Sequence, residues 1–359
     1  MTALLSKRLV WLLLWASLAA PAVAQSLAPR PSFSMMGLYQ RYTLDGTTLA
    51  EASMPIHLVV PLGTGFVASL ATTPALASGE AVADLGGMTD VQAGLSYTIE
   101  LGNARMALSL RSNVPSGKST LNAEEFSTAW QLSQSFYEFQ VPGFGQGFNI
   151  GPGLLGAFPI TEDFVIGLGV SYQYRGAYTP VEGGLGAYDP GDEFFFVGGL
   201  DYRFNPQTSV SLDLTYTLYG TDELADGRTF EAGNKLTAAV QLRRLFGFHE
   251  GRLALRYRAA TTSNLAVDGV LLDELQTVPS RGDLRAAVML RLAPDVSAEL
   301  LLHGRYYDAT ADFDRQTVLD IGLSPHYEVN DQLTVRSRFV YTTGTFGGLE
   351  GGLGLAVRL

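Results

Sequence analysis

The stretch RGDLRAAVMLRLAPDVSAELLLHGRYY, residues 281–307, decides the fold because apolar side chains recur in it at every second position. Successive side chains of an extended chain point to opposite faces, so this period predicts β-strands. The apolar row contains Leu284, Ala286, Val288, Leu290, Leu292, Val296, Ala298, Leu300, Leu302 and Tyr306. The other row contains Asp283, Arg285, Met289, Arg291, Ser297, Glu299, His303 and Arg305. The short turn at residues 293–295 joins the two runs into an antiparallel hairpin, with a lipid-facing outer wall and a wet, arginine-bearing inner wall.

The composition fits a β protein with many turns and excludes several classes of function. The 359 residues include 40 glycines, 16 tyrosines and 19 phenylalanines, a composition suited to turns and aromatic belts. The absence of cysteine excludes disulfides, thiolate metal sites and cysteine nucleophiles. A formal net charge of -11 argues against nucleic acid as a partner, because phosphate binding needs a basic surface.

The N-terminus has the features of a secretory signal peptide. Lys7 and Arg8 precede an apolar run over residues 9–20, and the small residues of Ala22-Val23-Ala24 follow. This order predicts export and cleavage after Ala24, which leaves residues 25–359 as one domain. An uncleaved membrane anchor is the alternative, and no apolar run of about 18 residues follows that could form a spanning helix.

Alternating segments recur along the rest of the chain and predict an all-β, transmembrane antiparallel β-barrel of about 12–16 strands. Residues 32–43 alternate weakly and are either a first strand or a plug-like entry segment, and residues 54–61 and 65–72 form a hairpin interrupted by prolines. Clearer hairpins cover residues 91–111, 148–175, 194–219, 235–259 and 316–342. The connections near Asn103, Thr161, Pro206, Gly247, Pro294 and Asn330 are short, and those near Asn113, Gly176, Gly220, Ser263 and Asp308 are longer. We therefore expect short periplasmic turns at one rim and longer extracellular loops at the other.

Residues 113–146 form the longest interruption and contain the sequence signature of a short helix. Asn122 with Glu125 three residues later is a capping box, and Phe126, Trp130 and Tyr137 then recur at helical spacing. This aromatic stripe is either a surface that captures an apolar solute or a face that packs on the barrel rim without binding anything.

The face opposite the apolar row is net basic, although the whole chain is acidic. Its basic residues are Arg105, Arg111, Arg175, Arg203, Lys235, Arg243, Arg252, Arg256, Arg258, Arg285, Arg291, Arg305, Arg336, Arg338 and Arg358. Its acidic residues include Glu100, Asp201, Asp213, Glu299 and Asp320. Two interpretations remain open: a pore lined by arginines that favours anions, or a lumen filled by a ladder of Arg–Asp and Arg–Glu pairs.

The sequence shows no constellation that points to catalysis or to a bound cofactor or metal. His303 and His326 face inward on neighbouring strands, but there is no Gly-x-Ser-x-Gly elbow and no His-Glu-x-x-His helix. No acidic loop matches calcium-loop spacing. We therefore expect no enzyme, and an inward histidine that completes a hydrogen-bond network in the lumen.

A family resemblance lies in Asn113-Val114-Pro115-Ser116-Gly117-Lys118, Asn149-Ile150-Gly151-Pro152-Gly153 and Tyr172-Gln173-Tyr174. These segments resemble the outer-membrane β-barrel transporters of fatty acids and aromatic hydrocarbons, including proteins associated with phenol degradation. The resemblance covers about a fifth of the chain. It implies passive uptake of small hydrophobic molecules through a barrel occluded by an N-terminal plug.

The sequence therefore predicts a passive channel in the bacterial outer membrane for small hydrophobic or amphipathic, and in part anionic, molecules. The alternative is a water-filled general porin with a mild anion preference. The expected partners are outer-membrane lipid, a small-molecule solute and the barrel-assembly machinery, and the oligomeric state stays open. The residues expected to line the lumen and meet the solute are Arg243, Arg256, Arg258, Arg285, Arg291, Arg305, Arg336 and Arg338, with Phe126, Trp130 and Tyr137 in the loop.

Overall fold

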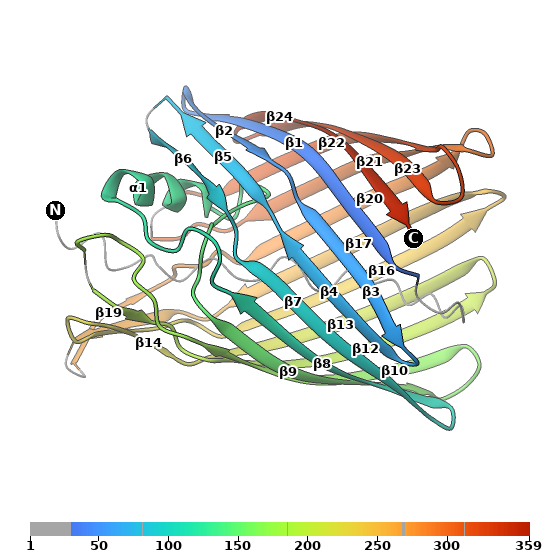
Figure 1. The fold of residues 1–359 in the computed structure, drawn as a ribbon, viewed down its shortest axis with the longest axis horizontal. Coiled ribbons are helices and arrows are strands. Elements are labelled where there is room, and N and C mark those ends of the chain that lie inside the picture. The colour runs from blue at the N-terminus through green and yellow to red at the C-terminus, as the bar shows by residue number, and fades with distance from the viewer. Residues whose placement is uncertain (1–29, 81, 185, 268–269, 312) are drawn as a thin grey trace.

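The structure is a computed structural model that describes residues 30–80, 82–184, 186–267, 270–311 and 313–359. It confirms the all-β prediction: a closed antiparallel barrel of 16 strands with one short helix (Figure 1). The first half of the wall consists of β1 (Ser32–Leu44), β2 (Thr47–Ser53), β3 (Ile56–Gly63), β4 (Phe66–Thr72), β5 (Pro74–Gly79), β6 (Val82–Met88), β7 (Val91–Leu101), β8 (Ala104–Val114), β9 (Asn149–Pro159) and β10 (Phe164–Arg175). The second half consists of β12 (Glu193–Asn205), β13 (Thr208–Tyr219), β16 (Lys235–Phe246), β17 (His249–Ala260), β20 (Arg281–Arg291), β21 (Val296–Tyr307), β22 (Gln316–Glu328), β23 (Leu333–Gly344) and β24 (Gly347–Arg358).

Three strands of the wall are broken at one level. The breaks separate β2 from β3 at Met54–Pro55, β4 from β5 at Thr73, and β6 from β7 at residues 89–90. Backbone hydrogen bonds still cross them: Met54 N–H donates to the Pro74 carbonyl at 2.9 Å, and Thr89 N–H donates to the Thr73 carbonyl at 3.0 Å. Proline cannot donate to a ladder, so two of the three breaks occur at Pro55 and Pro74.

Pairing of the first strand with the last closes the barrel. β1 and β24 are antiparallel over twelve residue pairs, from Ser32 opposite Arg358 to Thr43 opposite Gly347. Residues 32–43 are thus a wall strand and not a plug-like entry segment. Closure leaves no open sheet edge along this seam.

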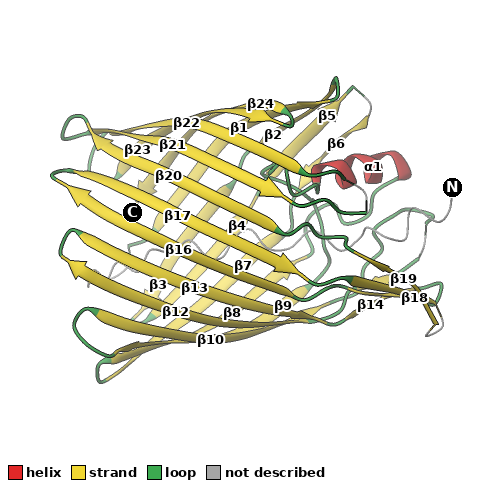
Figure 2. Cartoon of the chain, turned by 180° about the vertical axis from the view of Figure 1, so that it is seen from behind, coloured by secondary structure: helices red, strands yellow, loops and turns green. Residues whose placement is uncertain are grey.

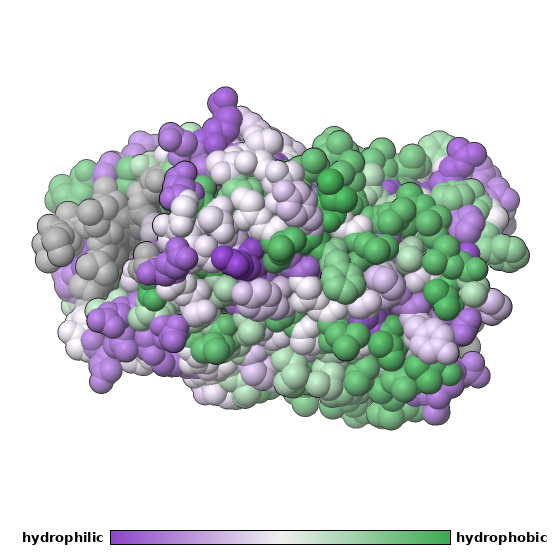
Figure 3. Space-filling model, turned by 90° about the horizontal axis from the view of Figure 1, so that it is seen from above, coloured by the Kyte–Doolittle hydropathy of each residue, from purple (hydrophilic) through white to green (hydrophobic). Residues whose placement is uncertain are grey.

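Alternation sorts the side chains as the sequence predicts. Even-numbered residues of β16 and odd-numbered residues of β23 face outward, and Val240 and Phe339 are examples with 42% and 55% exposure. Figure 3 shows apolar side chains gathered over the barrel wall and polar ones toward both ends. Exposed outward aromatics mark two levels: Phe66, Tyr202, Phe204, Phe246 and Tyr327 near one end, and Tyr174, Phe194, Tyr216, Tyr257 and Tyr341 near the other. Such paired girdles are typical of barrels that cross a bilayer.

The connections differ between the two ends of the barrel (Figure 2). We call the end with only tight turns the turn end, and its turns include residues 102–103, 206–207 and 247–248. We call the other the helix end, because it carries α1 (Ala123–Leu132). The predicted sorting is confirmed except near the seam, where tight turns at Asp45–Gly46 and Thr345–Phe346 and the short connection between β5 and β6 also lie at the helix end.

Parts of three expected loops, those near Gly176, Gly220 and Ser263, are instead ordered strands. β11 (Tyr188–Asp189), β14 (Thr221–Leu224), β15 (Arg228–Glu231), β18 (Ser263–Val267) and β19 (Val270–Leu275) form a second, five-stranded sheet at the helix end. The sequence analysis was wrong to treat the segments after Gly220 and Ser263 as loops. Their charged residues obscured short runs such as Thr229-Phe230, which pack a small core with Leu265.

The helix forms where the capping box predicts it. The Asn122 side chain accepts from the backbone of Glu124 and Glu125 at 3.0 and 2.9 Å, and the Glu125 side chain accepts from Asn122 N–H at 3.2 Å. A hydrogen bond from the Lys118 ammonium lowers the pKa of the Glu125 carboxyl. No helix among the described residues is long and apolar enough to cross a membrane. The predicted signal peptide and its cleavage site lie outside the described residues.

Adjacent residues at the middle of β16 test the assignment of the two faces. Val240 faces outward and Gln241 faces the lumen. We expect Val240→Arg to lower the free energy of unfolding by about 2–4 kcal/mol, because it places a charge on the lipid face, and Gln241→Arg to leave it nearly unchanged. Urea titration in phosphatidylcholine vesicles measures both. Equal losses for the two variants would contradict the inside–outside assignment.

Candidate functional site

The chain leaves the wall between β8 and β9 and folds into the barrel mouth. We call residues 115–148 the inserted loop. Both of its ends bind one buried carboxylate at the break between β6 and β7: Asp90 accepts from Gly117 N–H at 2.8 Å and from Gln146 N–H at 2.7 Å. Asp90 also accepts from the Asn113 amide at 2.6 Å. The broken strand therefore fixes where the loop starts and where it returns.

The inserted loop contributes half of the buried residues of the apolar core inside the helix end. Tyr137 stacks on Tyr42 of β1 with ring centroids 5.7 Å apart, and Phe136 packs against Tyr307 and Phe346. The buried members of this core are Tyr42, Leu49, Ala75, Ala77, Leu85, Leu121, Ala129, Leu132, Phe136, Tyr137, Phe139, Val141, Phe144, Tyr307, Val318 and Phe346. Loop and wall are thus packed together at β1, β2, β5, β6, β21 and β22. This part of the mouth is filled.

Glu138 links the tip of the loop to the arginines of β20 and β21. Its carboxylate lies 2.5 Å from Arg281 and 3.2 Å from Arg305, and both guanidinium groups are almost fully buried. Arg281 also pairs with Asp283, and Arg305 with Asp320 at 2.9 Å. Glu138 has a φ of 59°, a left-handed conformation that costs a non-glycine residue energy. The ion pairs hold it there, since buried arginines need carboxylate partners.

A second set of hydrogen bonds fixes the same tip to β1 and β2. The Gln40 side-chain oxygen accepts from Gln140 N–H at 2.7 Å, and the fully buried Glu51 carboxylate accepts from Val141 N–H at 3.1 Å. The tip is therefore fixed to two parts of the wall that β22, β23 and β24 separate. A segment held on both sides acts as a rigid partition across this side of the mouth.

The connection after β10 lies beside the inserted loop at the helix end. Val181 forms a β-bridge with Leu121 of the inserted loop, and the Tyr188 hydroxyl donates to Asp222 of β14 at 2.7 Å. Burial raises the pKa of the Asp222 carboxyl. Below this layer, Arg175 and Glu193 form a buried pair at 3.2 Å. The buried Tyr188–Asp222 contact thus holds β11 and β14 of the second sheet together, and the Arg175–Glu193 pair joins β10 to β12 of the wall.

Toward the turn end the lumen is open to water. Lumen-facing side chains are exposed there on several strands: Asp201, Asp213, Gln241, Arg256, Arg285 and Arg336. A barrel of this strand number is wide enough for an aqueous channel. The lumen therefore has two zones, a packed mouth at the helix end and a wet, charged bore below it.

All eight arginines expected to line the lumen face it, but they differ in their partners. Arg243 pairs with Glu250 at 2.7 Å, Arg285 lies 3.7 Å from Glu299, and Arg338 pairs with Glu350. Arg305 is sequestered with Glu138 and Asp320, and Arg258 donates to the Pro279 carbonyl at 3.4 Å. Arg256 is exposed in the bore but is not without a partner, because it also takes part in a polar or electrostatic contact.

Two of the eight remain available to a solute. Within the described chain, neither Arg291 nor Arg336 has a carboxylate within 4.0 Å, and both are exposed. The two interpretations of the basic face therefore each hold for part of it. Ion pairs fill the upper lumen, and a surplus of positive charge remains in the lower bore.

The three aromatic residues expected to capture a solute do not form one exposed stripe. The helix ends at Leu132, so Tyr137 lies beyond it and is buried in the mouth core. The prediction of helical spacing was wrong for Tyr137 because the chain turns at residues 134–137. Phe126 packs against the same core, and Trp130 stacks on Phe313 at 5.9 Å. Their part in binding stays a prediction.

Sequence reasoning missed the residues that hold the loop. Period-two alternation alone places Arg281 and Glu350 inward, so both could have been found. Glu250, the partner of Arg243, lies next to the predicted short connection near Gly247, and β17 already begins at His249. Glu138 carries no local signal. Its partners are about 140 and 170 positions away along the chain, a separation that only the closed barrel brings together.

The histidine cluster fits an ion-pair network better than a metal site. Ligand atoms of Glu138, His303 and Asp320 lie within 4.8 Å of one another. However, Arg281 and Arg305 occupy the same carboxylates, and His303 contacts Asp283 at 3.2 Å and Asp320 at 3.5 Å. Two buried cations beside the cluster oppose a third. His326 instead lies opposite Arg336 and is separate from this group.

No protein-family model and no curated protein sequence matches this chain. Solved structures with a similar barrel include OprB from Pseudomonas putida (TM-score 0.48, 10% identity, 91% of this chain and 93% of that one). OccK7 from Pseudomonas aeruginosa has a TM-score of 0.47 and 12% identity over 92% of this chain and 98% of that one. An anion-selective porin from Comamonas acidovorans has a TM-score of 0.41 and 11% identity over 91% and 98%. At 10–12% identity, these likenesses concern the barrel fold alone.

The Glu138 contacts predict how firmly the loop is held. Glu138→Gln removes the negative charge that Arg281 and Arg305 share. We expect protease cleavage within residues 133–146 of the intact barrel to become at least about tenfold faster, since losing one partner of a buried pair is costly. Glu124→Gln, at an exposed helical position, is the matched control. Unchanged cleavage in Glu138→Gln would show that the core alone holds the loop.

Proposed function

We propose that this chain is a passive outer-membrane channel for small amphipathic anions, with an outer mouth that the inserted loop keeps narrow. The observation that carries the proposal is the two-zone lumen: a packed mouth fixed by Glu138, Gln40 and Glu51, above a wet bore with surplus arginines. A wide bore permits passive flux, and the mouth limits it to solutes that pass the inserted loop.

The exterior supports an orientation in the membrane. Apolar side chains cover the wall between two aromatic girdles, as hydrocarbon requires. Barrels of this class place short turns in the periplasm and longer connections outside the cell. This assigns the turn end to the periplasm and the helix end, with the second sheet, to the extracellular side.

The preference for anions is supported by the position of the basic surplus. Arg291 and Arg336 project into the bore from β20 and β23, whereas the exposed carboxylates Asp201 and Asp213 project from β12 and β13. Positive charge on one part of the wall lowers the barrier for an anion that follows it. The carboxylates on β12 and β13 give the bore an electric field across its width rather than a uniform charge.

An apolar part of the lumen supports the amphipathic component. Leu155 faces the bore from β9 with 50% exposure, and Phe195 and Val197 face it from β12. Gly167 and Gly169 on β10 leave room beside them. A solute whose carboxylate faces the arginines and whose aromatic or aliphatic part faces these apolar residues would contact both surfaces. The general-porin alternative needs neither the apolar surface nor the packed mouth.

Removal of the inserted loop tests the narrowed mouth. Gly145 lies directly against the Ser119 backbone, so two glycines can replace residues 120–144 with little strain. We expect the wild type to conduct weakly in planar bilayers and the loop-replaced barrel to conduct at least about tenfold more. Heat-modifiable gel mobility verifies that the variant barrel is folded. A wild type that conducts as strongly as the variant would favour the general porin, and two silent barrels would exclude a channel.

A charge reversal in the bore tests the anion preference in the same loop-replaced barrel. We expect Arg336→Glu to lower the anion-to-cation permeability ratio by about two- to threefold, measured as a reversal potential across a KCl gradient. Arg244→Glu is the matched control, because Arg244 lies on the outer face near the turn end. Uptake of benzoate and of neutral benzyl alcohol into proteoliposomes then measures the solute class. Equal rates for the two would contradict the anion preference.

A further inference from the structure

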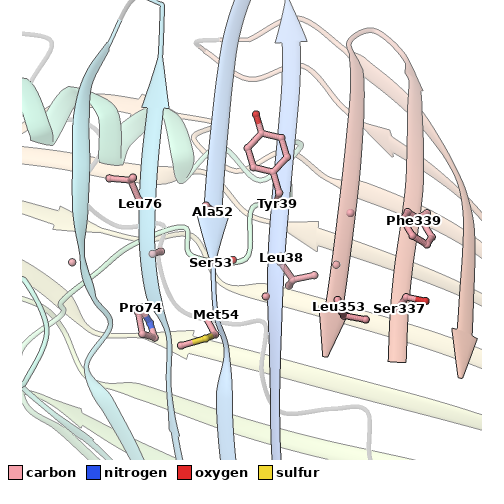
Figure 4. Close-up of a pocket in the computed structure, with 15 residues that line it drawn as sticks. Leu38, Tyr39, Ala52, Ser53, Met54, Pro74, Leu76, Ser337, Phe339 and Leu353 are labelled. Carbon is pink, nitrogen blue, oxygen red and sulfur yellow. The ribbon is translucent and has the colours of Figure 1, made fainter. Parts of the chain in front are cut away.

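The outer face of the barrel carries an apolar groove across the seam between β1 and β24. It has a volume of about 870 Å³ and is lined from β1, β2, β5, β23 and β24. Figure 4 shows Tyr39, Leu76, Phe339 and Leu353 around it, with Pro74 and Met54 toward its lower side. Its volume lies within the range of small-molecule ligand pockets, about 300–1,000 Å³. It is separate from the lumen, because Tyr39, Phe339 and Leu353 are outward residues.

The groove results from small residues at the level of the strand breaks. Gly37, Ala52 and Gly351 lie in its floor, and Pro74 follows the break in β4–β5. Open space surrounds Gly351 where a side chain would stand. The rim is large and apolar, with Tyr39 at 51%, Leu76 at 55% and Leu353 at 65% exposure. Because this wall faces hydrocarbon, an apolar hollow in it is shaped to hold part of an acyl chain.

A polar patch lies directly above the groove on the same outer face. Arg41 is two residues beyond Tyr39 on β1, so it stands about 7 Å nearer the helix end. Thr43 and Thr48 face each other there, with their hydroxyl oxygens 3.2 Å apart, and Ser78 is exposed opposite Ala50. Within the described chain, no carboxylate lies within 4.0 Å of the Arg41 guanidinium. The patch therefore offers one unneutralised cation and several hydroxyl donors.

We propose that the groove and the patch together bind one phosphorylated glycolipid of the outer leaflet, with an acyl chain in the groove and a phosphate on Arg41. The ligand is inferred from charge complementarity, because an arginine with hydroxyl donors recognises phosphate. The apolar lining of the groove fits an acyl chain. The two surfaces are stacked along the membrane normal in the order in which a lipid presents its headgroup and chain. The assignment to the outer leaflet rests on the orientation given under the proposed function.

Other occupants fit the groove less well. A second copy of this chain would bring an identical Arg41 patch to a seam contact and would have to bury unpaired cations. A neutral acyl chain would use the groove but leave the patch without a role. These occupants are therefore outcomes that the experiment distinguishes.

Native mass spectrometry of the full-length mature barrel tests the proposal. The barrel is placed in micelles of a neutral detergent with phosphatidylcholine and a small fraction of diphosphoryl lipid A, and bound lipid is counted after release. We expect one retained lipid A per wild-type barrel, and at least about tenfold weaker retention in Arg41→Glu. Gly351→Leu, which fills the groove, should give a similar loss. Heat-modifiable mobility verifies that each variant is folded.

Matched controls and a second lipid separate the outcomes. Arg244→Glu and Gly198→Leu make the same changes on the outer face away from the seam, and open space surrounds Gly198 as it does Gly351. Both control variants should retain lipid A as the wild type does. Equal retention in wild type and Arg41→Glu would leave only a neutral chain contact and overturn the proposal. Equal retention of phosphatidylglycerol, or release as a dimer without lipid, would also overturn it. Because the groove faces away from the bore, conductance should not change in these variants, so this result is independent of the channel test.

Discussion

Backbone hydrogen bonding in hydrocarbon is the constraint on which the structure depends. An unpaired N–H or C=O inside a bilayer costs several kcal/mol, so a sheet that crosses one has to close on itself. β1 and β24 meet this requirement over twelve residue pairs. Once the sheet is closed, alternate residues must face lipid and lumen, and the chemistry of each face follows from parity. The apolar belt and the arginine-bearing bore are consequences of one geometric rule.

The strand breaks are the exception to this continuous pairing, and one of them holds the inserted loop in the mouth of the barrel. Where β6 gives way to β7, Asp90 binds both ends of the inserted loop, so the chain can leave the wall without exposing unpaired backbone. The loop tip is then fixed by charges that are expensive to bury alone. Arg281 and Arg305 could not remain buried without Glu138, Asp283 and Asp320 beside them. The loop and the wall arginines therefore stabilise each other.

The seam serves different purposes on its two faces. Inside, Gly348 of β24 lies against the Tyr42 ring, where any larger residue would collide, and Tyr42 in turn packs on the inserted loop. Outside, Gly351 and Gly37 leave the shallow apolar groove beneath Arg41. The glycine-rich β24 thus permits a close aromatic contact in the mouth and an open surface toward lipid. Both the mouth core and the groove therefore depend on the small side-chain volume of β24.

The sequence by itself determined the barrel class, the parity of nearly every strand, the turn end and the capped helix, because these depend on local period and local hydrogen bonding. Parity also placed all eight arginines in the lumen. Only the tertiary structure decided which of them have partners, since Arg305 and Arg338 find Glu138 and Glu350 through strand order and loop insertion rather than through neighbours in sequence. It likewise decided that Tyr137 is buried and that the segments after Gly220 and Ser263 form a second sheet. Contacts between distant segments carry no periodic signal, so they become definite only when closure of the sheet fixes which strands are neighbours.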